Sequence, residues 1–316
     1  MQSKVSFLVY NTVCRCHILT DEFLYNTGTP YRPPPFELPV LYEDDYMALV
    51  NKPAGVVLYR AEGGRGGGAR GGGQGRDTLL SALPYFLKPA SNDTNIDDDV
   101  PLRRPQPVHR LDRPTSGCLV VAKRKKSLTH LAQQFEFRRV EKTYMAIVNG
   151  VPEVNETTGW NTIDYELDGK SAITKWRVIK TVKSLHGKGG QLTLVELKPL
   201  SGRYHQLRRH MAWVLKCPIV GDSTYDDDDN SAKRLRKRGL FLCSNELVVE
   251  HPYYNTQAGY KDWMNTSQSE KRSYGDEAEL YEHDTGMVMV KASISLPEKF
   301  SSFLEREGTR HDKFMT

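Results

Sequence analysis

The stretch "VHRLDRPTSGCLVVAK", residues 108–123, places one acidic side chain between two arginines and then continues into an apolar run. Asp112 is the only acid in this stretch, and Arg110 lies two positions before it. Residues two apart in an extended segment point to the same side, so Arg110 and Asp112 are predicted to share a face while Leu111 packs away from it. The turn at 114–117 then leads into a predicted buried strand, "CLVVAK".

The charge of Asp112 follows from its neighbour. A nearby arginine favours the ionised form of a carboxyl group. A carboxylate that stays charged at neutral pH suits a nucleophile or a base rather than a general acid. A structural ion pair at the end of a strand is the alternative reading, and these residues alone leave both open.

A second cluster of basic and aromatic residues lies in "SGRYHQLRRH", residues 201–210. Arg203, His205 and Arg208 fall in a predicted loop and the first turns of a helix, an arrangement that suits an anion such as phosphate. Arg208 lies three residues after His205, so the two share a helical face, and one of the arginines is predicted to reach Asp112. A solvated basic face is the alternative. Tyr144, on the predicted strand "KTYMAIVNG", is either a core residue or one that stacks on a base.

Composition limits the class of protein. The chain has 316 residues, 38% of them hydrophobic, and a net charge of +5, which is compatible with a polyanionic partner without requiring one. No apolar run approaches the roughly 18 residues of a membrane span, so no membrane partner is expected. The five cysteines are scattered, without CxxC pairs, which argues against a disulfide framework or a zinc site and favours a reducing compartment.

The pattern of elements predicts an α+β fold. Strands are predicted on both sides of the "EDD" turn at 43–45, at 172–180 and at 191–198, and an amphipathic helix is predicted at 127–139 with Ser127 as its cap. Strands outnumber helices and do not alternate with them, which favours a mixed or largely antiparallel sheet with helices packed on it.

The predicted domain organisation is one catalytic domain at 39–306, with an extension at 1–38 and a tail at 307–316. Flexible insertions are predicted at about 61–76, 91–100, 226–238 and 256–284. The first is Gly-rich and reads either as a plain loop or as an RGG-like segment that contacts RNA phosphates. "KRLRKR" at 233–238 reads as a phosphate patch, a nuclear signal or a surface loop, and the acidic run before it reads as a solvated loop or a divalent-ion site.

Taken together, these motifs resemble the RluA-type pseudouridine synthases. "HRLDRPTSG" is similar to that family's active-site signature, and "NKPAG", "KTYMAIVNG", "PLSGRYHQLRRH", "PIVGDSTY" and "EHP" accompany it in the family's order. Within the family, "LAQQFE" and "HQLRRH" followed by "PIVGDS" resemble the TruC subgroup, the tRNA pseudouridine synthases that act on uridine 65 of the T stem. The resemblance covers residues 39–304.

The resemblance implies a fold, an activity and roles for named residues. The fold is the pseudouridine synthase catalytic fold, a mixed and mostly antiparallel sheet with flanking helices and a central RNA-binding cleft. The activity is isomerisation of uridine in RNA, without cofactor or metal. The implied catalytic residues are Asp112, Tyr144 and Arg208, with Arg208 in a buried salt bridge to Asp112. The implied substrate-binding residues are Arg110, Leu207, His205, Arg203 and Lys142.

The expected partner is RNA, with tRNA favoured over ribosomal RNA, and the protein is expected to be an intracellular monomer whose compartment is left open. A non-catalytic RNA-binding protein of the same fold is the rival reading, although binding alone does not require Asp112. A hydrolase with a single aspartate lacks the second carboxylate that glycosidases pair with the first.

Overall fold

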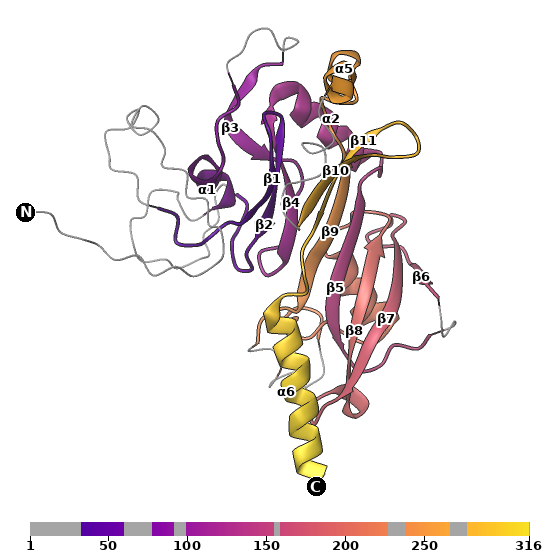
Figure 1. Ribbon diagram of the computed structural model, residues 1–316. Helices are drawn as coiled ribbons and strands as arrows, with labels where there is room; N and C mark the ends of the chain where they lie inside the picture. Colours follow the sequence, from indigo (N-terminus) through magenta and orange to yellow (C-terminus); the bar gives the residue numbers. More distant parts are fainter. Residues whose placement is uncertain are drawn as a thin grey trace, which may run out of the picture.

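One mixed sheet organises the molecule (Figure 1). The computed structural model describes residues 33–59, 78–91, 99–154, 159–226, 235, 238–265 and 277–315. Eleven strands of this part run in the order β1-β2-β4-β9-β5-β8-β7-β6, with β3 on β4 and the pair β10–β11 on β9. The strands are β1 Val40–Glu43, β2 Met47–Lys52, β3 Pro101–Pro107, β4 Ser116–Arg124, β5 Glu141–Asn149, β6 Asn161–Asp164, β7 Ile173–Lys183, β8 Gln191–Pro199, β9 Leu242–Glu250, β10 Ala278–Glu282 and β11 Val288–Ser293.

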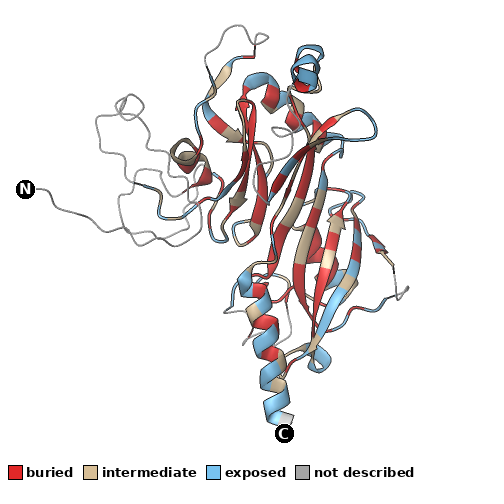
Figure 2. Cartoon of the chain, in the orientation of Figure 1, coloured by how far each residue is buried: buried red, intermediate tan, exposed pale blue. Residues whose placement is uncertain are grey.

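The helices are few and cover parts of the sheet, as the α+β prediction requires. They are α1 Leu79–Phe86, α2 Lys125–Glu136, η2 Lys188–Gly190, α3 Gln206–Arg209, the π-helical turn η3 His210–Val214, α5 Gln257–Asn265 and α6 Glu298–Met315. Buried residues line the strands and one side of α6 (Figure 2). No helix in the described ranges combines the length and apolarity needed to cross a membrane.

The join between β4 and β9 holds the two halves of the sheet together and is its one parallel pairing among the described strands. Gly117 of β4 lies opposite Ser244 of β9 with φ +116°, and a Cβ at this position would overlap the Ser244 carbonyl. Only glycine fits such a close backbone approach. The glycine that ends the "PTSG" turn therefore allows the signature loop to sit beside β9.

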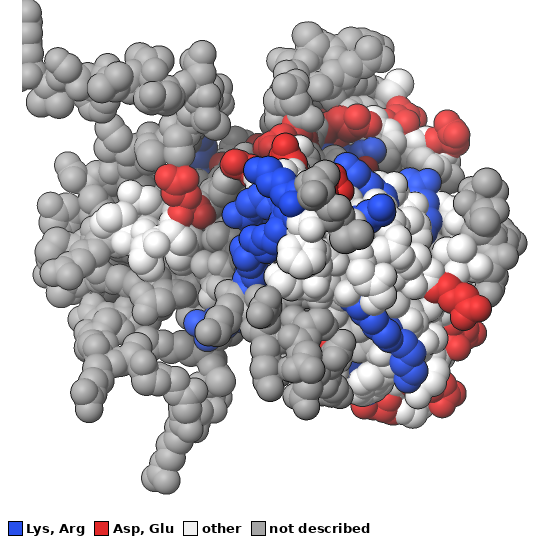
Figure 3. Space-filling model, turned by 90° about the horizontal axis from the view of Figure 1, so that it is seen from below, with Lys and Arg blue, Asp and Glu red and all other residues white. Residues whose placement is uncertain are grey.

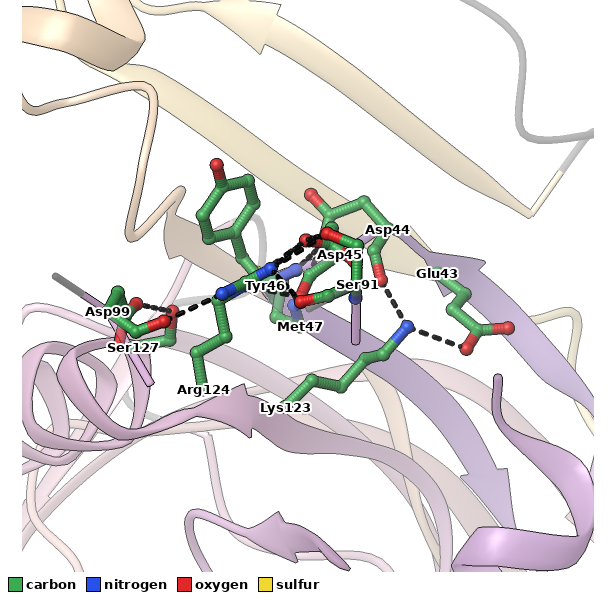
Figure 4. A network of polar contacts seen from close by, with 10 residues as sticks. All are labelled: Glu43, Asp44, Asp45, Tyr46, Met47, Ser91, Asp99, Lys123, Arg124 and Ser127. Atoms are coloured by element: carbon green, nitrogen blue, oxygen red, sulfur yellow. Dashed lines mark hydrogen bonds and ion pairs between the residues drawn. The ribbon is translucent and has the colours of Figure 1, made fainter. Parts of the chain in front are cut away.

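The acidic turn at 43–45 connects β1 and β2. The two strands predicted on either side of it are confirmed. The Asp44 carboxylate accepts hydrogen bonds from the backbone N–H groups of Tyr46 and Met47, both at 2.7 Å, and contacts His251 Nε2 at 2.5 Å. The neighbouring carboxylate of Asp45 binds Arg124, as Figure 4 shows. The turn thus ties the first hairpin to the ends of β4 and β9.

Helix α2 begins two residues earlier than predicted, and Ser127 is not its cap. Asp99 supplies the cap from outside the helix, because its carboxylate accepts the Lys126 N–H at 2.6 Å and the Ser127 hydroxyl at 3.3 Å (Figure 4). A carboxylate also complements the positive end of the helix dipole. Asp99 belongs to the predicted insertion at 91–100, so the end of that segment is an ordered part of the fold.

Two further predicted segments contain ordered elements. At the ends of the predicted insertion 256–284 lie α5 and the strand β10, which pairs with β11 along its whole length, while residues 266–276 lie outside the described part of the chain. The predicted tail at 307–316 continues α6, and Glu307 is buried there, where it accepts a 2.6 Å hydrogen bond from Ser184. Short amphipathic helices gain most of their stability from packing against the rest of the fold.

The structure does not describe residues 1–32, 60–77, 92–98, 155–158, 227–234, 236–237, 266–276 and 316. The predictions for the Gly-rich segment, most of the acidic run and most of "KRLRKR" therefore lie outside the described residues. Seen from the end of the molecule shown in Figure 3, basic side chains form short bands between uncharged and acidic ones. The mild net charge is therefore not gathered into one basic field on this face.

Candidate active site

The signature residues 108–115 form a loop between β3 and β4. Leu111 anchors the loop because its side chain is 6% exposed and packs in the hydrophobic cluster that contains Leu79 and Leu119. The Thr115 N–H donates to the Asp112 carbonyl at 3.0 Å and closes a turn. Burial of Leu111 on one side presents the Asp112 side chain on the other, where it is 21% exposed.

The "NKPAG" turn supports this loop from below. The fully buried Lys52 ammonium donates to the carbonyls of Val56 at 2.9 Å and Arg113 at 3.4 Å, and Gly55 N–H donates to the same Arg113 carbonyl at 2.7 Å. Burial lowers the pKa of Lys52 to about 8, and the nearby Asp112 carboxylate partly opposes that shift. Lys52 therefore carries a positive charge beneath the Asp112 loop at neutral pH.

Arg208 projects from α3 toward Asp112 but is held mainly by another acid. Its Nη1 lies 3.4 Å from Asp112 Oδ2, whereas its Nε and Nη2 donate to the two carboxylate oxygens of Asp222 at 2.6 and 2.7 Å. Nη2 also donates to Thr224 Oγ1 at 3.0 Å. The salt bridge that the resemblance implies between Arg208 and Asp112 is present at 3.4 Å. Arg208 makes its shorter, bidentate contact with Asp222, whose side chain is fully buried.

His205 is the second cation-capable group beside Asp112. Its Nε2 lies 3.5 Å from Asp112 Oδ2 and its Nδ1 lies 2.9 Å from Tyr225 Oη. The residue adopts a left-handed backbone, φ +50°, just before α3, which turns the ring toward the loop. Burial lowers the pKa of His205 and the Asp112 carboxylate opposes that shift, so the neutral ring predominates at neutral pH.

Tyr144 enters the site from β5. Its ring is half-buried and packs against both hydrophobic clusters of the core. Burial raises the pKa of Tyr144 to about 12, and the negative charge of Asp112 adds to the shift. The phenol therefore stays protonated at neutral pH and is available as a hydrogen-bond donor.

These side chains line one pocket of about 520 Å³ between the 108–115 loop, β5 and α3. All the site residues predicted from the sequence border this pocket: Arg110, Asp112, Lys142, Tyr144, Arg203, His205, Leu207 and Arg208. A larger hollow of about 740 Å³ lies between β6 and the end of η3, but none of the predicted residues borders it. No cluster of three potential metal ligands occurs among the described residues.

Arg110 differs from its prediction. It does not form an ion pair with Asp112 in the described part of the chain, and its side chain is exposed at the mouth of the pocket. The expected shared face assumed a strand, whereas residues 108–115 form a loop in which Leu111 is buried and Arg110 is exposed. Lys142 lies deeper in the pocket, where burial and the nearby Arg138 lower its pKa.

Sequence reasoning did not identify the residues that hydrogen-bond to the site residues from outside the pocket. Lys52 and Asp222 are fully buried or nearly so, and Thr224 and Tyr225 bind the outer side of Arg208 and His205. The blocks "NKPAG" and "PIVGDSTY" marked these segments as parts of the family pattern. The signal that could have identified Lys52 and Asp222 is that each is a charged residue close to a glycine turn within one of these blocks.

His109, which precedes Arg110 in the signature, is predicted to make stability depend on pH. Its Nε2 accepts the Val120 N–H at 3.0 Å and its ring stacks on Phe135, with 4.4 Å between centroids. Burial lowers the pKa of His109 from 6.5 to about 3, which agrees with a ring nitrogen that accepts a hydrogen bond. Below about pH 6.5 His109 is protonated in the unfolded chain but stays neutral in the folded protein. The free energy of unfolding therefore decreases as the pH falls.

At about pH 5, which lies about 1.5 units below the pKa of His109 in the unfolded chain, this residue is expected to lower the free energy of unfolding by about 2 kcal/mol. One pKa unit corresponds to about 1.4 kcal/mol. The measurement is urea unfolding at about pH 7.5 and pH 5 for the wild type and for His109→Gln, which retains an acceptor but does not titrate. The wild type should lose about 2 kcal/mol more than the variant. An equal loss in both proteins would show that His109 is not responsible.

The arrangement supports covalent or base chemistry by Asp112. Arg208 Nη1 and His205 Nε2 approach the same carboxylate oxygen, Oδ2. A carboxylate with one oxygen directed at two such groups is held in a fixed orientation, which suits a nucleophile or a base. The half-buried Tyr144 and the buried Leu207 border the pocket with apolar surface on which a flat heterocycle can pack. Arg110, Arg138 and Arg203 border the same pocket.

Comparison with known proteins gives the same assignment. Residues 46–213 match the family of RNA pseudouridylate synthases. A tRNA pseudouridine synthase C of Vibrio parahaemolyticus is 32% identical over 242 residues, which cover 71% of this chain and 89% of that protein. The ribosomal large subunit pseudouridine synthase D of Borreliella burgdorferi is 33% identical over 234 residues, and the match spans 69% of this chain and 63% of that relative.

The solved structure of human RNA pseudouridylate synthase domain containing 4 shares the fold. It aligns with a TM-score of 0.53 over 85% of this chain and 92% of that one, at 21% identity. The family match covers more than half of the chain, and the Vibrio relative exceeds 30% identity over more than two thirds of it. The chain therefore belongs to the RNA pseudouridylate synthase family, whose members isomerise uridine to pseudouridine in RNA.

Proposed function

We propose that this protein isomerises uridine in tRNA, at uridine 65 of the T stem, and that it acts as a monomer. The observation that carries the chemical part is the Asp112 carboxylate in a pocket beside Arg208, His205 and Tyr144. The tRNA assignment is supported by the extent of the matches. The tRNA synthase of Vibrio is matched over 89% of its length, whereas the ribosomal relative of Borreliella is matched over 63%.

In the proposed reaction the C1′–N1 bond of the uridine breaks, the uracil rotates, and C5 bonds to C1′. The C5 proton then passes to a base or to water and N1 takes up a proton, so the product is an isomer of uridine. Asp112 begins the reaction either by attacking C1′, in which case its bond to C1′ breaks when C5 attacks, or by removing a ribose proton to give a glycal, in which case that proton is returned when C5 adds. Tyr144 packs on the uracil and donates a hydrogen bond from its phenol. Arg208 and His205 hold the carboxylate in place.

Entry of the base requires a flipped nucleotide. Unstacking a uridine costs on the order of a few kcal/mol, and contacts with the phosphates have to offset that cost. Arg110 at the mouth is proposed to occupy the space of the extruded base, while Arg203 and Lys142 bind phosphate and Leu207 packs near the base. Such contacts make RNA affinity fall steeply with salt.

The test is isomerisation by the full-length protein of an unmodified tRNA transcript, read by chemical mapping of pseudouridine. Product at position 65 is expected, and a transcript with cytidine at that position is expected to give none. Product in ribosomal RNA alone would overturn the tRNA assignment and leave the isomerase class. RNA binding without product in either RNA would favour the non-catalytic reading.

A further inference from the structure

Tyr204 presents an aromatic face to solvent at the rim of the active-site pocket. Its side chain is 61% exposed although the residue borders the pocket. One face of the ring stacks on the His205 imidazole, with 3.7 Å between centroids and 20° between planes. The exposed area therefore belongs to the opposite face and the edges of the ring.

The backbone and ring of Tyr204 are held in place before any substrate arrives. His205, on which the ring rests, is bound through Nδ1 to Tyr225 Oη. Arg209 donates from Nη1 to the Tyr204 carbonyl at 3.3 Å, and Asp168 holds that guanidinium with two hydrogen bonds of 2.8 Å. A surface that is already ordered loses little conformational entropy on binding.

We propose that Tyr204 is a stacking platform for the base next to the target uridine. The inference rests on the isomerase activity proposed above. His205 lies between Tyr204 and the reacting carboxylate, because its ring stacks on Tyr204 while its Nε2 lies 3.5 Å from Asp112 Oδ2. A uracil at Asp112 has its neighbour one phosphodiester away, at the rim where Tyr204 lies.

Extrusion of the target base explains why its neighbour would stack on Tyr204. When the target base leaves the stack, its neighbour loses a stacking partner on one face, and a tyrosine ring replaces that partner. Arg203 adjoins Tyr204 on the same rim, with its Nε bound to the Ser171 carbonyl at 3.1 Å, and supplies a cation for the connecting phosphate. Stacking on an aromatic ring tolerates any base, so the platform contributes affinity for an unstacked neighbour rather than for a sequence.

An exposed tyrosine is by itself common. Tyr165 is an example, because it is 48% exposed on the loop after β6 and does not border the active-site pocket. Tyr204 differs in bordering the pocket and in resting on a residue that contacts Asp112. Tyr165 is therefore a matched control.

The experiment measures binding of short single-stranded RNAs that contain one central uridine. In one RNA series, 2-aminopurine stands on the 5′ or the 3′ side of that uridine, and in a second RNA both neighbours are abasic. The proteins are the full-length wild type, Tyr204→Ala, Tyr204→Phe and Tyr165→Ala. For the wild type we expect quenched 2-aminopurine fluorescence at one of the two positions.

Tyr204→Ala should remove the quenching and weaken binding roughly tenfold, whereas Tyr204→Phe and Tyr165→Ala should bind like the wild type. With abasic neighbours, Tyr204→Ala and the wild type should bind equally. The proposal is overturned by equal affinity of Tyr204→Ala for the base-containing RNA, by a loss that persists with abasic neighbours, or by failure of the wild type to bind these RNAs. Binding is read without turnover, so a protein that makes no pseudouridine leaves this outcome intact.

Discussion

Asp112→Asn is expected to abolish isomerisation, with a fall in turnover on the order of 10⁴-fold or more, because the amide is neither a nucleophile nor a base. RNA affinity should stay close to that of the wild type, since the substitution leaves all the basic residues that border the pocket unchanged. Single-turnover kinetics on the tRNA transcript and filter binding measure the two effects separately.

Asp164→Asn is the matched control, because this exposed aspartate on β6 does not border the active-site pocket. It should retain normal turnover. Mass spectrometry of the purified Asp112→Asn protein excludes deamidation back to aspartate. If Asp112→Asn protein that is free of deamidation still forms product at an appreciable rate, Asp112 is not the reacting group.

Asp222→Leu is expected to affect both folding and turnover. Asp222 is 1% exposed and accepts both short hydrogen bonds of Arg208, so its loss leaves a buried guanidinium without its main partner. Breaking a buried pair on one side typically costs about 3–5 kcal/mol. Turnover should fall about 10²-fold, because Arg208 Nη1 no longer has a fixed position beside Asp112.

The double variant Arg208→Met, Asp222→Leu separates positioning from stability. Two apolar side chains remove both charges, so the urea midpoint should recover part of its loss while turnover stays low. The remaining loss comes from the backbone N–H groups of Thr224 and Tyr225, whose hydrogen bonds Asp222 accepts in the wild type. Asp168→Asn is the control, because Asp168 forms the same bidentate geometry with Arg209 but is largely exposed and should change the unfolding midpoint little. Recovery of turnover together with stability in the double variant would show that Arg208 is not needed beside Asp112 and that the Arg208–Asp222 pair has a structural role only.

Local patterns predicted much of the fold. Alternating apolar residues predicted the strands that became β1, β2, β7 and β8, and the spacing of Leu128, Leu131 and Phe135 predicted the helix α2. The start of that helix was wrong because its cap, Asp99, comes from a distant segment. The strand β10 and the last turns of α6 were missed because neither has a strong local signal apart from its packing partner.

The site shows the same division. The motifs identified eight of the residues that border the pocket, because each motif combines charged or aromatic side chains with turn residues. They did not reveal that Asp222 rather than Asp112 holds Arg208 tightly, or that Lys52 lies buried beneath the signature loop. They also did not reveal that Arg110 faces solvent, because that follows from the loop conformation of 108–115.

The sequence by itself determined which chemical groups the protein brings to its substrate: one carboxylate in "HRLDRPTSG", the arginines and histidine of "SGRYHQLRRH", and a tyrosine on a strand. Only the tertiary structure decided how they pair. Arg208 and Asp112 are 96 residues apart, and the distance between their side chains depends on how β4, β5 and β9 align in the sheet. Side-chain type and periodicity are local properties, whereas the partner of a buried charge is set by long-range packing, where each guanidinium binds the carboxylate that burial places closest to it.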